Sequence, residues 1–191
     1  MNFDNLTAEQ IGKLFPIRIV PYNPYWITLF EQEKELIINI LDENMALSIE
    51  HFGSTSVAGL AAKPTIDILI EVSQLSNEIK QFIIQKLATI GYGNMYKAEK
   101  DNKMTFGKGY DLNVDCMQTY HAHIREKDHR PQDEIYFRDY LRQNTGARDE
   151  YAQLKYALAE KYPFNREDYT QAKTEFIKKI TERAKAKFSQ F

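Results

Sequence analysis

The chain carries the stretch His51-Phe-Gly-Ser-Thr-Ser-Val-Ala-Gly-Leu-Ala-Ala-Lys-Pro-Thr-Ile-Asp-Ile-Leu-Ile70, which decides its fold. Two apolar segments, Ser48 to Phe52 and Thr65 to Val72, have the length and composition of strands. Gly53 permits a sharp turn after the first segment, and the hydroxyl residues behind it suit the start of a short helix. The stretch therefore predicts a strand, a phosphate-sized loop and a second strand.

The loop between these strands has the composition of an anion site. Amides at the start of a helix lack intrahelical partners and carry a partial positive charge through the helix dipole, so phosphate groups bind there. The predicted phosphate-binding residues of this loop are His51, Gly53, Ser54, Thr55 and Ser56. The same Gly-Ser-Thr-Ser run is also typical of an ordinary strand-to-helix turn capped by serine.

Two charged residues near the loop favour the anion site over the plain turn. Lys63 follows within reach of the loop, and Asp67 interrupts the apolar run of the second strand. A carboxylate in such a run is rarely buried without a partner or a metal, and Mg²⁺ is held by one or two carboxylates together with phosphate oxygens. We therefore expect Asp67 to bind a divalent metal ion, Mg²⁺ or Mn²⁺, and Lys63 to act beside it in catalysis.

The segment from His51 to Ile70 resembles the signature of the GrpB-like proteins, a branch of the nucleotidyltransferase superfamily. Further segments resemble other motifs of that family, and the resemblance extends from Ile17 to Ile180. These segments are Pro21-Tyr-Asn-Pro-Tyr-Trp26 with Phe30-Glu31, His121-Ala-His123, Phe137 to Arg142, Tyr151 to Lys155 and Tyr169 to Lys173. The resemblance implies an α+β fold: a nucleotidyltransferase-like mixed β-sheet covered by helices, with a helical C-terminal segment.

The superfamily pattern also implies two carboxylates one residue apart on a strand and a third on a neighbouring strand. Asp67 matches the first position, but Leu69 occupies the second. Glu71 shares the parity of Asp67 but lies about 13 Å farther along a strand, so we interpret it as a surface residue at the strand end. The missing carboxylate weakens two-metal catalysis, which needs several carboxylate oxygens around ions about 3.5–4 Å apart.

The pair His121 and His123 is a candidate to complete the site. Strand residues two apart face the same way with about 7 Å between their Cα atoms, so both imidazoles can converge on one metal or phosphate. Imidazole beside a carboxylate suits Zn²⁺ or Mn²⁺ better than Mg²⁺. The alternative is an edge strand with half-buried, hydrogen-bonded histidines. On an extended strand Asp115 has the same parity and is a candidate third carboxylate.

Arg138 and Arg142 lie four residues apart in a predicted helix. This spacing lets two guanidinium groups bind one phosphate or acidic substrate. In the structural alternative, Asp139 and nearby acids pair with them on a solvated face. We interpret Lys155 and Lys173 as exposed helix positions whose apolar stems pack down, and the tyrosines of this region as packing residues.

Hydrophobic spacing and turn residues predict the remaining elements. Amphipathic helices are expected over 26–41 and 79–90, with Gly91 ending the second, and a helical segment over 131–191. Strands are expected over 17–20, 92–96 and 103–107 and within 111–124, with a turn at 107–109. We expect one domain over residues 1–191, with residues 1–16 as an N-terminal lead.

Composition limits the partners. The chain has a net charge of −2, which argues against an extended nucleic-acid surface or a membrane footprint. Cys116 is the single cysteine and excludes an internal disulfide. No apolar run approaches the roughly 20 residues of a membrane span, and the first residues lack the pattern of a secretion signal. We therefore expect a cytoplasmic protein.

Together these features predict a metal-dependent nucleotidyltransferase that acts on a nucleoside triphosphate, or another phosphorylated small molecule, and an acceptor. Asp67, His121 and His123 are the expected metal ligands, and Arg138 and Arg142 are expected to bind phosphate with the loop. Two alternatives are open. The lost second carboxylate at Leu69 suits a non-catalytic module that binds a nucleotide or phosphometabolite. The histidines suit a metal-dependent phosphohydrolase.

Overall fold

The computed structural model describes residues 7–41, 44–95, 103–110, 118–128 and 132–188. The chain forms two compact units that are interleaved along the sequence. One unit comprises residues 1–23, 57–64 and 131–191, and the other comprises residues 24–56 and 65–130. The chain thus leaves the first unit and returns to it twice. The expectation of one domain over residues 1–191 stays a prediction.

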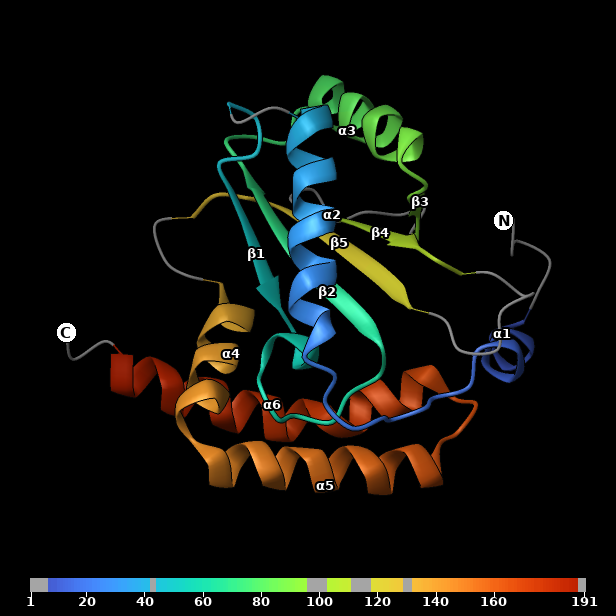
Figure 1. Ribbon diagram of the computed structural model, residues 1–191, viewed down its shortest axis with the longest axis vertical. Coiled ribbons are helices and arrows are strands. Elements are labelled where there is room, and N and C mark those ends of the chain that lie inside the picture. Colours follow the sequence, from blue (N-terminus) through green and yellow to red (C-terminus); the bar gives the residue numbers. More distant parts are fainter. Residues whose placement is uncertain (1–6, 42–43, 96–102, 111–117, 129–131, 189–191) are drawn as a thin grey trace. The chain divides into compact units, whose positions relative to one another are not determined.

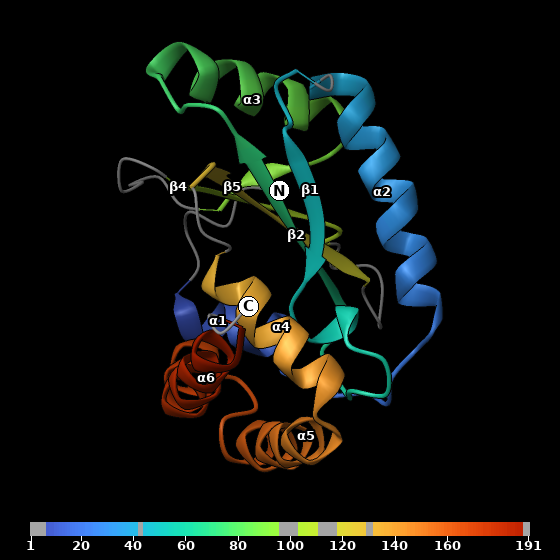
Figure 2. The same cartoon turned by 90° about the vertical axis from the view of Figure 1, so that its left-hand side faces the viewer.

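A five-stranded mixed sheet forms the centre of the unit that contains residues 24–56 and 65–130 (Figures 1 and 2). Its strands lie in the order β1 (Ser48–Phe52), β2 (Thr65–Val72), β5 (Thr119–Glu126), β4 (Lys103–Lys108) and β3 (Gly93–Asn94). The pair β2–β5 is parallel, and the other neighbouring pairs are antiparallel. The predicted strands on both sides of the loop, β1 and β2, are confirmed at both ends.

The register of the sheet places the predicted metal ligands on one face. Asp67 is aligned with His121 in the parallel pair, and Leu69 is aligned with His123. Because aligned residues of neighbouring strands point to the same face and side chains alternate along each strand, Asp67 shares a face with both histidines. The residues between them, such as Ile68 and Ala122, point to the opposite face.

That opposite face forms the core of this unit with helix α2 (Tyr25–Leu41), which lies along the sheet (Figure 2). The ring of Phe30 in α2 stacks on the His51 ring of β1, with 4.7 Å between the centroids. Fully buried aliphatic side chains contribute about 1.5–3 kcal/mol each to such a core. The sheet supplies Ile66, Ile68, Ile70, Ala122 and Ile124 to it.

Helix α3 (Asn77–Thr89) confirms the second predicted amphipathic helix of this unit. The Ser76 side chain accepts a hydrogen bond from the Ile79 amide and caps its start. Gly91 follows its end with a φ of +90°, a conformation that glycine adopts without strain. Inside the helix, Ile83 and Leu87 are buried.

The other unit is helical and contains α1 (Ala8–Leu14), α4 (Asp133–Gln143), α5 (Thr145–Lys161) and α6 (Arg166–Phe188). Helices α5 and α6 lie side by side (Figures 1 and 2). The core of this unit comprises Val57, Leu60, Leu141, Tyr151 and Ile180. The predicted helical C-terminal segment is thus confirmed, and Tyr151 is a packing residue, stacked on Phe176 at 5.2 Å.

Four of the predicted strands need correction. The described residues 17–20 do not form a strand: Val20 makes one isolated bridge to Ala62, and a ladder needs several consecutive partners. Strand β4 continues through Lys108, so the predicted turn is confined to Gly109, which has a φ of +86°. Strand β3 comprises Gly93–Asn94 of the predicted 92–96, and strand β5 ends two residues beyond the predicted stretch. Asp115 and Cys116 lie outside the described residues.

Candidate metal and phosphate site

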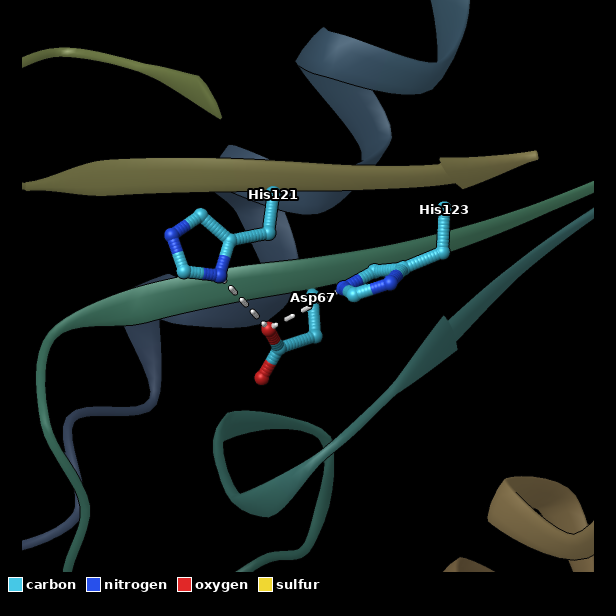
Figure 3. Close-up of side chains that lie close together, drawn as sticks. All are labelled: Asp67, His121 and His123. Carbon is cyan, nitrogen blue, oxygen red and sulfur yellow. Dashed lines mark ion pairs between the residues drawn. The ribbon is translucent and has the colours of Figure 1, made fainter. Parts of the chain in front are cut away.

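A carboxylate and two imidazoles converge on the sheet face that points away from α2. Asp67 extends from β2 between the rings of His121 and His123, which both extend from β5 (Figure 3). The Oδ1 atom of Asp67 lies 3.5 Å from Nδ1 of His121 and 3.9 Å from Nε2 of His123. One ligand atom from each residue lies within 4.8 Å of the other two. The structure therefore brings together the three residues that the sequence predicts as metal ligands.

The environment of His123 keeps its ring neutral. Burial lowers the pKa of His123 to about 4, with Asp67 acting in the opposite direction and His121 and Arg125 in the same direction. The rings of Phe52 and His123 pack in a T-shaped pair, with 5.1 Å between their centroids. A neutral imidazole has a free lone pair at neutral pH, which is the form that binds a metal.

The turn after β1 lies directly against the Asp67 carboxylate. Gly53 has a φ of +70°, and a Cβ atom at this position would lie 2.2 Å from Oδ2 of Asp67. Glycine is therefore required here for two reasons: the backbone conformation is left-handed and the carboxylate occupies the space of a side chain. The predicted loop and the predicted carboxylate are thus neighbours in space.

The hydroxyl groups of Thr55 and Ser56 form hydrogen bonds that stabilise the conformation of the loop. Residues Ser54–Ser56 form a single 3₁₀ turn, η1. The Thr55 hydroxyl donates to the Thr65 carbonyl at 2.9 Å and lies 3.0 Å from Nε2 of His51. The Ser56 hydroxyl donates to the Gly53 carbonyl at 2.7 Å. His51, Thr55 and Ser56 are buried, so Ser54 is the hydroxyl residue with solvent access among them.

The predicted contribution of a helix dipole at this loop needs correction. A macrodipole grows with the number of aligned peptide units, and η1 has only three residues. The Ser56 amide donates to the Gly53 carbonyl at 3.3 Å, so the earlier amides of the turn and the half-buried Ser54 hydroxyl are the donors that this loop can offer to an anion.

Leu69 occupies the position at which the superfamily pattern has its second carboxylate. Leu69 has the same parity as Asp67 and is only 1% exposed. Glu71 accepts a hydrogen bond from the Ser48 hydroxyl at 2.7 Å, close to the end of β2. This contact agrees with the interpretation of Glu71 as a strand-end residue.

The predicted cationic residues Lys63, Arg138 and Arg142 belong to the helical unit. The Lys63 ammonium lies 5.9 Å from the centroid of the Tyr169 ring. Asp139 forms ion pairs with Arg138 at 2.7 Å and with Arg142 at 3.5 Å. Pairing of both arginines with Asp139 is the structural alternative posed by the sequence, although Arg138 is buried rather than solvated. Their contact with phosphate stays a prediction.

The predicted exposure of Lys155 is wrong. Its side chain is buried, its ammonium donates a hydrogen bond to the Ala61 carbonyl, and it lies 4.7 Å from the centroid of the Tyr151 ring. A carbonyl and an aromatic face partly compensate a lysine for lost water. The ammonium of Lys173, whose side chain is half-buried, lies 4.2 Å from the Tyr169 ring centroid.

Tyr110 is a site residue that the sequence patterns did not single out. Its hydroxyl lies 2.5 Å from Nε2 of His121, and the two rings stack with 6.0 Å between centroids and 15° between planes. The sequence feature that could have indicated Tyr110 is the run Gly107-Lys-Gly-Tyr110, in which two glycines precede an aromatic residue at the end of a strand.

Comparison with known proteins identifies the family of this chain. The family model described as GrpB protein matches residues 16–183. The chain belongs to the GrpB protein family. It is 37% identical to "Glutamate-rich protein GrpB" of Alkalihalophilus pseudofirmus over 163 residues, which cover 85% of this chain and 92% of that protein. The crystal structure of the conserved protein GrpB from Enterococcus faecalis aligns with a TM-score of 0.77 and 34% identity, covering 90% of this chain and 99% of that one.

A more distant structure, outside the GrpB family, shares the fold of this chain. The Cid1 poly(U) polymerase, in a crystal structure described as MgGTP bound, aligns with a TM-score of 0.50 and 12% identity. The alignment covers 80% of this chain and 46% of that one. The nucleotidyltransferase-like fold expected from the resemblance is thus confirmed. Among the described residues, no helix combines the length and apolar character needed to cross a membrane.

Proposed function

We propose that this GrpB family protein binds a nucleoside triphosphate together with a divalent metal ion and transfers the nucleotidyl group to an acceptor. The observation that carries the proposal is the contact between the Gly53 turn and the Asp67 carboxylate, where a Cβ atom at Gly53 would lie 2.2 Å from Oδ2. This contact puts a loop suited to phosphate beside a group suited to a cation, an arrangement needed to bind a metal-bound triphosphate.

The three converging side chains fit a divalent cation by their chemistry. Asp67 offers a carboxylate oxygen and His121 and His123 offer one imidazole nitrogen each, all within 4.8 Å of one another. Two nitrogens and one oxygen suit Zn²⁺ or Mn²⁺ better than Mg²⁺. When bound, such a cation offsets the negative charge that develops on phosphate oxygens.

The chain's own residues have separate tasks in this proposal. The amides of the Gly53 turn and the Ser54 hydroxyl donate hydrogen bonds to phosphate oxygens, which positions the reacting phosphorus. Thr55 anchors the turn to β2 through its hydrogen bond to the Thr65 carbonyl, and Ser56 holds the turn in shape through its hydrogen bond to the Gly53 carbonyl. The acceptor attacks the α-phosphorus and pyrophosphate leaves, so no side chain needs to form a covalent intermediate. Lys63, Arg138 and Arg142 are proposed to neutralise the departing charge.

The fold supports this substrate class. The Cid1 crystal structure is that of a poly(U) polymerase with MgGTP bound, and its similarity to this chain at 12% identity concerns the fold alone. The MgGTP of that structure and the donor set of this site together make a magnesium- or manganese-bound nucleotide the first ligand to test.

A metal-dependent phosphohydrolase is a second candidate, favoured by the donor set. Leu69 is buried where the superfamily carries a second carboxylate, which disfavours two-metal nucleotidyl transfer. The two histidines favour a single metal that activates water instead. In this case the products would be inorganic phosphate and a nucleotide with one phosphate fewer, not pyrophosphate.

A thermal-shift survey with product analysis tests the proposal. The melting temperature is measured with ATP, GTP, CTP and UTP, each with and without Mg²⁺, Mn²⁺ or Zn²⁺, because a ligand that binds the native state raises it by mass action. We expect a shift that needs nucleotide and metal together, and its loss in Asp67→Asn but not in the matched control Glu71→Gln. Pyrophosphate release then supports transfer, phosphate release supports hydrolysis, and binding without turnover supports a binding module.

A further inference from the structure

We propose that Tyr110 is a positioning residue that orients the His121 ring and, when a cation is bound, accepts a hydrogen bond from the tautomer that carries its proton on Nε2. In this tautomer the Nδ1 lone pair faces the Asp67 carboxylate. The inference rests on the proposed metal site, because only a cation between Nδ1 and the carboxylate makes that orientation favourable. Tyr110 itself contacts neither the cation nor a reacting atom in this account.

The contact between Tyr110 and His121 is specific to one nitrogen of the ring. The Tyr110 hydroxyl lies 2.5 Å from Nε2 of His121, whereas Nδ1 faces Oδ1 of Asp67 at 3.5 Å. The two ring nitrogens therefore have different partners on opposite sides of the imidazole. Hydrogen bonding at one nitrogen of a metal-binding histidine is the common way to fix the tautomer at the other.

Two glycines give Tyr110 its place over His121. Gly107 is the register partner of His121 in the pair β4–β5, and a Cβ atom there would lie 2.9 Å from Sδ of Met95 and 3.1 Å from Cε2 of Tyr110. Gly109 turns the chain with a φ of +86°, and a Cβ atom there would lie 2.5 Å from the Gln118 carbonyl oxygen. The sheet thus lacks a side chain beside His121 at the position where the tyrosine ring packs.

The hydroxyl group suits both states of the site. A tyrosine hydroxyl donates one hydrogen bond and also accepts. Without a cation, Nδ1–H of His121 points toward the Asp67 carboxylate and the Tyr110 hydroxyl donates to Nε2. With a cation, the imidazole proton resides on Nε2 and is donated to the Tyr110 oxygen, while the Nδ1 lone pair binds the cation. The imidazole stays neutral and carries one proton in both states.

This arrangement favours cations that accept imidazole nitrogen. A hydrogen bond to the outer nitrogen raises the basicity of the ligating nitrogen and fixes the ring orientation. Zn²⁺, Mn²⁺ and similar ions gain from this, whereas Mg²⁺ prefers oxygen ligands and gains little. Tyr110 is thereby a determinant of which metal class the site binds.

The substitution Tyr110→Phe tests the inference because it removes one oxygen and keeps the stacked ring. The Zn²⁺ dissociation constant is measured by competition with a chromophoric chelator, without any substrate. We expect the affinity to fall roughly 10- to 100-fold, the range for lost outer-shell partners. The matched control is Tyr120→Phe. Tyr120 directly precedes His121 on β5, and its side chain points to the opposite face of the sheet.

A spectroscopic measurement separates positioning from a general structural effect. Long-range ¹H–¹⁵N correlation spectra of the histidine-labelled, Zn²⁺-loaded protein identify the bound nitrogen. We expect Nδ1 of His121 to be bound and Nε2 to carry a slowly exchanging proton, which exchanges rapidly in Tyr110→Phe. The inference is overturned by Zn²⁺ binding through Nε2, or by Zn²⁺ affinity of Tyr110→Phe within about twofold of the wild type. A wild-type protein that binds neither Zn²⁺ nor Mn²⁺ refutes the metal site of the proposed function itself.

Discussion

Asp67 of β2 and His121 of β5 are register partners in the parallel pair of the sheet, with 3.5 Å between Oδ1 and Nδ1. This alignment creates the candidate site, because His123 then follows on the same face two residues later. A slip of one residue between the two strands would turn both histidines toward α2. The site thus depends on a register that the buried isoleucines of β2 fix from the other face.

Asp67→Asn should abolish metal-dependent nucleotide binding while the fold persists. The amide keeps the shape of the carboxylate but loses the charge that attracts a cation. The checks are isothermal titration with Mn²⁺ and nucleotide, and thermal unfolding without ligand. A marked fall in the ligand-free melting temperature would instead identify Asp67 as a structural residue.

Gly53→Ala should both destabilise the protein and weaken nucleotide binding. The alanine would adopt a φ of +70° and place its Cβ atom 2.2 Å from Oδ2 of Asp67. Strain of this kind costs about 1–3 kcal/mol, and relief of the clash displaces the carboxylate. Urea unfolding and nucleotide titration measure the two effects. Gly93→Ala is the control, since a Cβ atom there meets no atom within 4 Å; equal losses in both variants would contradict the account.

The metal-free protein should lose stability as the pH falls from about 6.5 to about 4. The pKa of His123 is lowered to about 4 in the folded state, whereas an unfolded histidine titrates near 6.5. Between these values the unfolded chain binds more protons, so the free energy of unfolding decreases with decreasing pH. His123→Gln should flatten this dependence in urea unfolding series at several pH values. An unchanged slope would show that His123 is not the group responsible.

Leu69→Asp should lower the melting temperature of the metal-free protein but strengthen Mg²⁺ binding. Leu69 is 1% exposed, and an unpaired carboxylate at a buried position costs several kcal/mol. The new side chain would share the parity of Asp67 and restore the paired carboxylates that two ions need. Magnesium titration and pyrophosphate release measure the gain. If neither increases, the missing carboxylate does not limit the activity of this chain.

Local chemistry explains which parts of the fold were predictable. The strands β1 and β2 follow from apolar runs and the glycine between them, and α3 follows from its Ser76 cap and Gly91. The common face of Asp67, His121 and His123 follows from strand parity together with the family resemblance. Residues 17–20 look equally strand-like, but they make one bridge, because pairing depends on distant neighbours.

Contacts between distant segments explain what was missed. Glu33 lies in the middle of α2 and is buried because Lys108, on β4, donates to it at 2.7 Å. Lys155 is buried because Ala61 offers its carbonyl. Tyr110 contacts His121 only because β4 and β5 pair in one register. None of these partners is visible from helix or strand periodicity.

Anomalous diffraction from crystals soaked with Mn²⁺ or Zn²⁺ and a non-hydrolysable triphosphate would show directly whether Asp67, His121 and His123 hold a metal ion beside the triphosphate. The account predicts one strong peak about 2.0–2.2 Å from a carboxylate oxygen of Asp67, Nδ1 of His121 and Nε2 of His123, with phosphate oxygens facing the Gly53 turn. An ion bound elsewhere, or a triphosphate bound away from Asp67, would contradict it.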